Sequence, residues 1–100
     1  MPLYTIRRAV GDASREDVDA SAFRAMACAI EYPGMRWIRS YWDREAGVLT
    51  CLYEAHSAAE IQEHSRRSRI ACDEVREVTE FGPEDYAGLA PLPALASDPA

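Results

Sequence analysis

Three short segments in the middle of the chain hold the side chains that are best suited to chemistry. They are residues 37–41, 50–55 and 63–67. Together they supply an aromatic pair, a thiol, a carboxylate, an imidazole and several guanidinium groups. A hydrophobic core alone does not require this mixture, so the functional hypotheses start from these segments.

His64 and Glu54 are the candidate acid–base pair. The His64 imidazole can act as a metal ligand, as a general acid or base, or as a hydrogen-bonded residue of the core. Glu54 stands at the end of a predicted strand, where its carboxylate can orient His64, cap the following helix or lie in water. If the protein is an enzyme, we expect these two residues to be the catalytic ones.

Cys51 precedes Glu54 in the same predicted strand. Its sulfur can serve as a soft metal ligand or a nucleophile, although a free cysteine is more often a small buried hydrophobe. Alternation along the strand places Cys51 and Glu54 on opposite faces, so a site that uses both must lie at the strand end. The sequence alone leaves these interpretations open.

Arg39 lies between Trp37 and Tyr41, and alternation predicts that the three share one face of a strand. A guanidinium on an inner face needs a carboxylate, an aromatic surface or an anionic ligand. We therefore predict a ligand-binding set of Arg39, Trp37 and Tyr41, with Tyr53 from the neighbouring strand. An internal salt bridge for Arg39 is the alternative, and both tyrosines are also suited to a core or an interface.

The elements that must position these residues follow from hydrophobic periodicity, capping residues and turn residues. The predicted strands are residues 3–10, 35–43, 48–55 and 74–81, and the predicted helices run from the Ser14 cap to Pro33 and over residues 57–68. This β-α-β-β-α-β order predicts an α+β protein of the ferredoxin-like class.

The two faces of the predicted sheet differ. Ile61 indicates that one side of the second helix packs on the sheet and takes His64 with it. On the first helix the predicted apolar stripe is Val18, Ala22, Ala25, Met26, Ala29 and Ile30. The opposite face of the sheet is predicted to present Trp37, Tyr41, Leu49 and Tyr53, which is too apolar for water. We therefore expect a homodimer built as a dimeric α/β barrel.

Composition limits the classes of function. The chain has 100 residues, 48% of them hydrophobic and 28% charged, and its net charge is −6. An acidic protein is a poor partner for nucleic acid, because binding to phosphates needs a basic surface. The three cysteines include no Cys-x-x-Cys pair, which argues against a disulfide framework or a structural zinc site.

Domain organisation is predicted to be simple. Residues 1–86 form the ferredoxin-like domain, and residues 87–100 form an extended Ala- and Pro-rich C-terminal tail. We see neither a signal peptide nor an apolar run of membrane-spanning length, so a cytoplasmic protein with no membrane partner is expected.

The three segments also match the motifs of a known family in order. The matching residues are Trp37, Ser40 and Tyr41, then Cys51, Tyr53, Glu54 and Ala55, then Glu63 and His64. On these residues the chain resembles a family of small bacterial ferredoxin-like proteins, mostly of unknown function, named for a nickel-binding member. Arg39 stands where that family usually has His. The resemblance implies that nickel or another divalent transition metal is bound by His64 with Cys51 or Glu54.

Two functions from different classes remain. The first is a homodimer that binds a transition metal or a small ligand through His64 and its neighbours. The second is a small enzyme without an organic cofactor, of the isomerase, cyclase or oxygenase type. It would act on an anionic molecule in the barrel cleft, with His64 moving a proton and Arg39 holding the anion.

Overall fold

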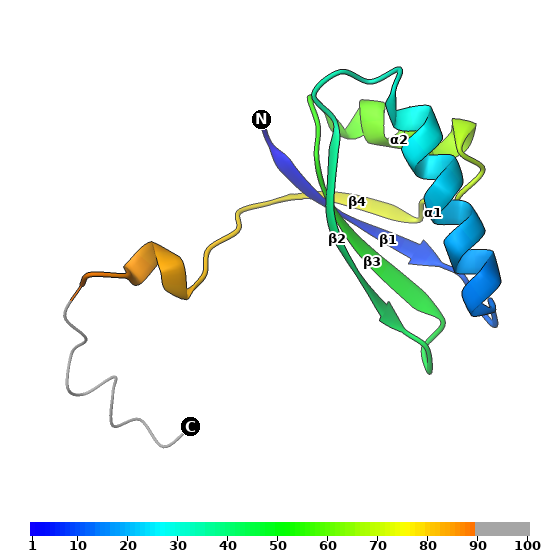
Figure 1. The fold of residues 1–100 in the computed structure, drawn as a ribbon, viewed down its shortest axis with the longest axis horizontal. Helices are drawn as coiled ribbons and strands as arrows, with labels where there is room; N and C mark the ends of the chain where they lie inside the picture. The colour runs from blue at the N-terminus through cyan, green and yellow to red at the C-terminus, as the bar shows by residue number, and fades with distance from the viewer. Residues whose placement is uncertain (90–100) are drawn as a thin grey trace.

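Strands and helices follow one another along the chain in the predicted order, β-α-β-β-α-β. In the computed structural model, which describes residues 1–89, the elements are β1 (Leu3–Ala9), α1 (Arg15–Ala29), β2 (Arg36–Asp43), β3 (Val48–Glu54), α2 (Ala58–Arg67), β4 (Glu74–Val78) and the short 3-10 helix η1 (Pro83–Tyr86) (Figure 1). Every predicted strand and helix bound lies within four residues of the observed one, and the largest differences are at the ends of α1 and β4.

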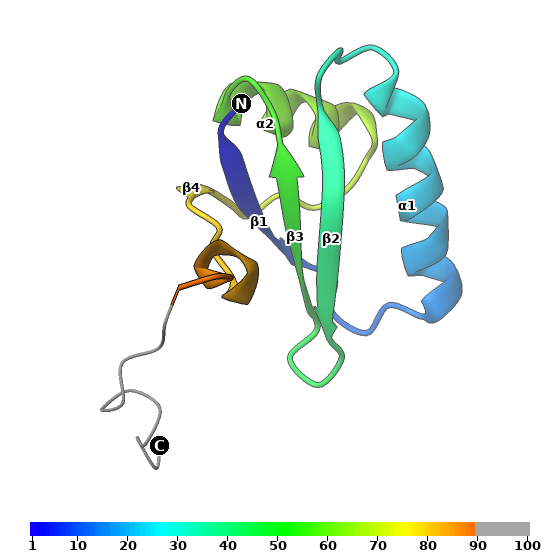
Figure 2. The same ribbon diagram turned by 60° about the vertical axis from the view of Figure 1, so that its left-hand side comes forward.

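The strands form one antiparallel sheet in the order β2-β3-β1-β4. Both helices lie on the same face of this sheet (Figure 2), and the other face is left without a covering layer among the described residues. The α+β fold is thereby confirmed, with the strand order of the ferredoxin-like class. No helix in the described part of the chain is long and apolar enough to cross a bilayer.

Side-chain caps begin both helices where the sequence indicates. The Ser14 side chain accepts a hydrogen bond from the Asp17 N–H at 3.1 Å, and the Asp17 carboxylate accepts one from the Ser14 N–H. The bond from the Ser14 N–H favours the ionised carboxylate and is the largest cause that lowers the pKa of Asp17. Ser57 caps α2 in the same way by accepting from the Glu60 N–H. Each helix start therefore has partners for N–H groups that the helix itself leaves free.

Gly47 ends the β2–β3 hairpin in a backbone conformation that other residues avoid. Its φ is +69°, its carbonyl accepts from the N–H groups of Val10 and Gly11, and a Cβ there would meet the Gly11 carbonyl oxygen at 2.7 Å. Gly11 has a similar φ of +58°, but a Cβ on it would have no neighbour within 4 Å.

This difference makes the two glycines a matched pair for a stability measurement. We expect Gly11→Ala to lower the free energy of unfolding by about 1–2 kcal/mol, the cost of a left-handed backbone with a side chain. For Gly47→Ala we expect about 2–5 kcal/mol, because a backbone clash adds to that cost. Urea denaturation of both variants measures the two losses. Equal losses would mean that the contact between the two turns is unimportant.

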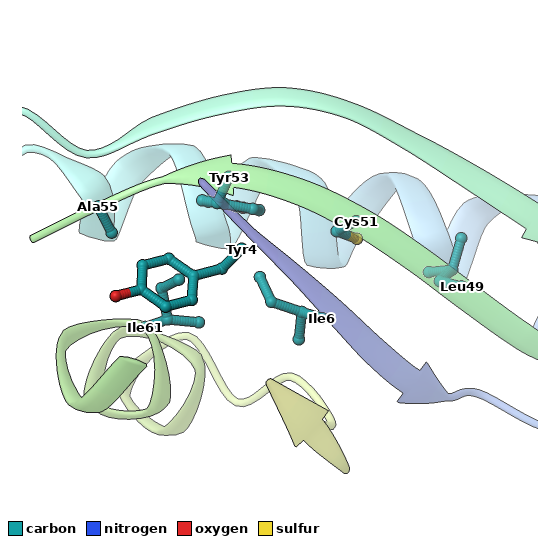
Figure 3. Packing of buried hydrophobic residues seen from close by; sticks show 7 residues of the cluster. All are labelled: Tyr4, Ile6, Leu49, Cys51, Tyr53, Ala55 and Ile61. Carbon is teal, nitrogen blue, oxygen red and sulfur yellow. The ribbon is translucent and has the colours of Figure 1, made fainter. Parts of the chain in front are cut away.

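The hydrophobic core lies between the sheet and the helices. Its buried members are Tyr4, Ile6, Leu49, Cys51, Tyr53, Ala55 and Ile61 (Figure 3). The register of β1 against β3 pairs Tyr4 with Tyr53 and Ile6 with Cys51, so these side chains share the helix-bearing face. The prediction that Leu49 and Tyr53 face away from the helices was therefore wrong.

A β-bulge in β2 explains a second difference from the predicted faces. Trp37 pairs with Tyr53, but the register shifts between Trp37 and Arg39, and Arg39 then pairs with Leu52. The extra residue reverses the alternation. Trp37 and the later residues Ser40 and Trp42 consequently point to the helices, whereas Arg39 and Tyr41 point to the open face. The prediction of one common face for Trp37, Arg39 and Tyr41 was wrong for this reason.

Helix α1 turns its small residues toward the sheet. Ala25 is its only fully buried residue. Met26 and Ile30 of the predicted stripe are 46% and 83% exposed, and Phe23 is also exposed. Small side chains beneath a helix leave space between it and the sheet, and this space is the candidate site described next.

Beyond β4 the chain leaves the sheet. The short helix η1 projects away from the domain (Figure 1), and the rings of Phe81 and Tyr86 pack edge to face while both stay exposed. Most of the predicted tail, residues 90–100, lies outside the described residues.

Candidate ligand-binding cleft

A cleft of about 230 Å³ separates α1 from strands β2 and β3. On the helix side its wall is made by Arg15, Val18, Asp19, Ser21, Ala22 and Ala25. On the sheet side the wall is made by Arg8, Trp37, Ser40, Trp42, Leu49, Cys51 and Tyr53. Exposed Arg15 and half-exposed Trp37 line the cleft together with buried residues, so it leads from the surface into the core.

Arg8 is the cleft's buried charge. It is only 2% exposed, and its Nη1 donates to the Ser65 hydroxyl at 2.9 Å and to the Ala71 carbonyl at 2.7 Å. Its guanidinium also lies 6.0 Å from the centre of the Tyr53 ring. Among residues 1–89 it forms no ion pair with any Asp or Glu. Within these residues Arg8 is thus a buried cation held by neutral groups, without an ion-pair partner.

Other polar groups lie near this guanidinium. Burial raises the pKa of Tyr53 to about 12, against the opposite effect of the Arg8 charge, so the hydroxyl remains a donor at neutral pH. Along the β2 side of the cleft, the Trp37 indole N–H donates to the Ser40 hydroxyl at 2.9 Å, which in turn donates to the Cys51 sulfur at 2.9 Å. The β-bulge makes this chain of bonds possible, because it brings Trp37 and Ser40 to one face.

His64 lies deeper, between the two helices. It is completely buried, and its Nε2 donates to the Ala25 carbonyl of α1 at 2.8 Å, while Nδ1 has no partner in the described structure. Because a carbonyl can only accept, the neutral ring carries its proton on Nε2. Burial is the main cause that lowers the pKa of His64. His64 does not line the cleft.

The three residues that the family resemblance implies as metal ligands do not converge. The His64 Nε2 is bonded to a carbonyl and the Cys51 sulfur to Ser40. Glu54 pairs with Arg36 at 3.4 Å and alternates to the face opposite Cys51. In the described part of the chain, no three His, Cys, Asp or Glu side chains are placed to hold a metal ion. These residues therefore do not fit a nickel site within one chain.

Only part of the predicted ligand-binding set meets in the cleft. Trp37 and Tyr53 line it, whereas the open face holds Arg39 and Tyr41. Arg39 is exposed, and Tyr41 is 64% exposed. Nor does Glu54 reach His64, so the predicted acid–base pair is not formed in this structure.

Arg8, the buried guanidinium in the cleft wall, is not among the predicted site residues. Arg8 lies on the same strand face as Tyr4 and Ile6, and its burial follows from this alternation. A charged residue in the inward register of an otherwise apolar strand is the signal that identifies it.

Comparisons with known proteins add the family and the fold. A family model described as "Nickel responsive protein SCO4226-like" matches residues 4–78. The chain is similar to the crystal structure of SCO4226 from Streptomyces coelicolor A3(2), with a TM-score of 0.72 and 18% sequence identity, over 80% of this chain and 99% of that chain. No curated protein matches. The family match includes Arg8 and every predicted site residue, and it ends with β4.

Proposed function

The chain belongs to the SCO4226-like family of nickel responsive proteins, and on this premise we propose that it is a small binding protein whose cleft holds an anionic small molecule. The observation that supports this function is the buried guanidinium of Arg8, which has no ion-pair partner in the described part of the chain and lies in the wall of an open cleft. Burying a cation without a counter-charge is costly, and an anionic ligand beside it offsets that cost.

Nickel is indicated only by the description of the family. The donor atoms of His64, Cys51 and Glu54 are engaged separately and do not form a ligand set. The proposed function therefore does not depend on a metal ion.

The proposal includes a homodimer. The uncovered sheet face presents Leu3, Leu52 and Val78, all partly exposed, together with the exposed Tyr41. Apolar side chains on an uncovered sheet favour a covering layer, and a second copy placed face to face supplies one. In such a dimeric barrel the two clefts lie on the outer sides, which bear the helices.

The enzymatic alternative has less support. It needs His64 to move a proton of the ligand, but the imidazole is fully buried and lies outside the cleft wall. It also needs Arg39 to hold the anion, and Arg39 lies on the other face. The carboxylate in the cleft wall, Asp19, is paired with Arg15 at 2.9 Å, so binding is the function that the geometry favours.

Titration calorimetry with acetate, benzoate and phosphate tests this function. We expect at least one anion to bind the wild type, and Arg8→Met to weaken that binding about tenfold to hundredfold, because a charge-assisted hydrogen bond is lost. Arg8→Lys should weaken it less, since it keeps the charge but loses the fork. Arg39→Met is the matched control and should bind like the wild type. Equal affinities in wild type and Arg8→Met would overturn the proposal.

A further inference from the structure

We infer that the cleft selects a small monocarboxylate with a compact apolar body, about the size of one six-membered ring. This inference rests on the proposed function and names its ligand class. Three features of the described residues lead to it: the free edge of the Arg8 guanidinium, the apolar lining above it and the limited volume.

The free edge of Arg8 suits a carboxylate. Nη1 is already engaged by Ser65 and Ala71. Among the described residues, Ser65 and Ala71 accept only from Nη1, and the Tyr53 hydroxyl also interacts with the Arg8 side chain by a hydrogen bond. Nε and Nη2 together form the planar two-donor edge that matches the two oxygens of a carboxylate. The fixed Nη1 bonds orient this edge before any ligand arrives, so little ordering is needed on binding.

The lining indicates an apolar body. Val18 and Ala22 on α1 face Trp42 and Leu49 on the sheet across the cleft. None of these side chains offers a charge to a ligand, and the Trp42 indole N–H, which has no partner in the described structure, is the single hydrogen-bond donor among them. A ligand whose remaining atoms are apolar gains from leaving water here, whereas a hydroxyl-rich ligand such as a sugar acid loses hydrogen bonds.

Volume and charge exclude larger and more highly charged anions. The cleft's 230 Å³ is below the roughly 300–1,000 Å³ of pockets for drug-sized ligands. Arg15, the only other cation in its wall, is paired with Asp19 at 2.9 Å. One unpaired cation balances a single negative charge on a ligand. A second negative charge would be repelled by the protein's net charge of −6, so a monocarboxylate fits better than a phosphate dianion.

The test compares five probes on the full chain by calorimetry: benzoate, cyclohexanecarboxylate, acetate, phosphate and benzyl alcohol. We expect the two cyclic carboxylates to bind at least about tenfold more tightly than acetate, since each buried apolar group adds affinity. Phosphate and benzyl alcohol, which lack either the apolar body or the charge, should bind more weakly than benzoate by a similar factor.

Two variants on α1 test the location of the body. Ala22→Leu fills the cleft from the helix side, and we expect it to weaken benzoate binding about tenfold or more while acetate binding changes little. Ala20→Leu adds the same atoms at an exposed position outside the cleft and should bind benzoate like the wild type.

The outcomes separate the ligand class from the function. If phosphate binds as tightly as benzoate and Arg8→Met or Arg8→Lys weakens both, the cleft is an anion site and the monocarboxylate class is overturned. If benzoate binds equally to Ala22→Leu and to the wild type, the ring lies elsewhere and the inference fails. If no probe depends on Arg8, the proposed function itself falls, and this inference with it.

Discussion

Leu49→Arg is expected to unfold the protein. Leu49 is 7% exposed and belongs to the core between the sheet and the helices. The substitution removes a buried apolar side chain and places a charge in the same position. An unpaired buried charge costs about 3–5 kcal/mol, which is a large part of the roughly 5–15 kcal/mol that stabilises a typical domain. Circular dichroism during urea titration should show the loss of the cooperative transition or a midpoint far below that of the wild type.

Leu52→Arg is the matched control, three residues further along β3 and on the other face of the sheet. Leu52 pairs with Thr5 and Arg39 on the open face and is only partly buried. We expect this variant to keep the fold and to dissociate the proposed dimer, since each sheet face would gain a charge at the interface. Light scattering should give a dimer for the wild type and a monomer for Leu52→Arg. A wild type that is monomeric at micromolar concentration would contradict the barrel, whatever the variants do.

The sequence alone does not establish on which face of the sheet each of these two leucines lies. Element order and helix starts follow from local signals, such as the caps at Ser14 and Ser57, and these are physical properties of a few adjacent residues. To predict which face of the sheet a strand residue occupies, the register of the neighbouring strand must also be known. Regular alternation predicts that Trp37, Arg39 and Tyr41 lie on one face of the sheet. The β-bulge, which no local residue pattern indicates, places Trp37 on the opposite face from Arg39 and Tyr41.

The site is harder to predict than the fold because its contacts join residues that are far apart in the chain. Arg8 is held by Ser65 and Ala71, and His64 by Ala25 of the other helix. The prediction that Ile61 and His64 share the inward side of α2 is confirmed, since both are buried. The helical pattern does not predict which hydrogen-bond partner each polar side chain has. For His64, that partner decides whether the imidazole is free to react.

His64 should make the protein less stable in mild acid. Its imidazole is fully buried, and burial is the largest of the causes acting on its pKa, which is lowered. The Arg8 charge also lowers it, whereas the Ala25 hydrogen bond and the Glu60 carboxylate raise it and only partly compensate. A protonated ring would carry a second N–H at Nδ1, where the described structure provides no partner.

The sign of the effect follows from proton binding in the two states. The unfolded chain takes up a proton at His64 near pH 6.5, the ordinary histidine value, while the folded chain resists protonation until a lower pH. Stability from the neutral ring is therefore fully present above about pH 6.5 and is lost as the pH falls through that value toward the folded pKa. The loss is about 1.4 kcal/mol for each unit that separates the two pKa values.

Urea unfolding at several pH values between 7.5 and 5 measures this loss. We expect the free energy of unfolding of the wild type to fall across this range more steeply than that of His64→Gln, which cannot titrate there. His56→Gln, in which an exposed histidine is replaced, should keep the steep slope of the wild type. Parallel slopes for the wild type and His64→Gln would show that His64 is not the group that senses acid.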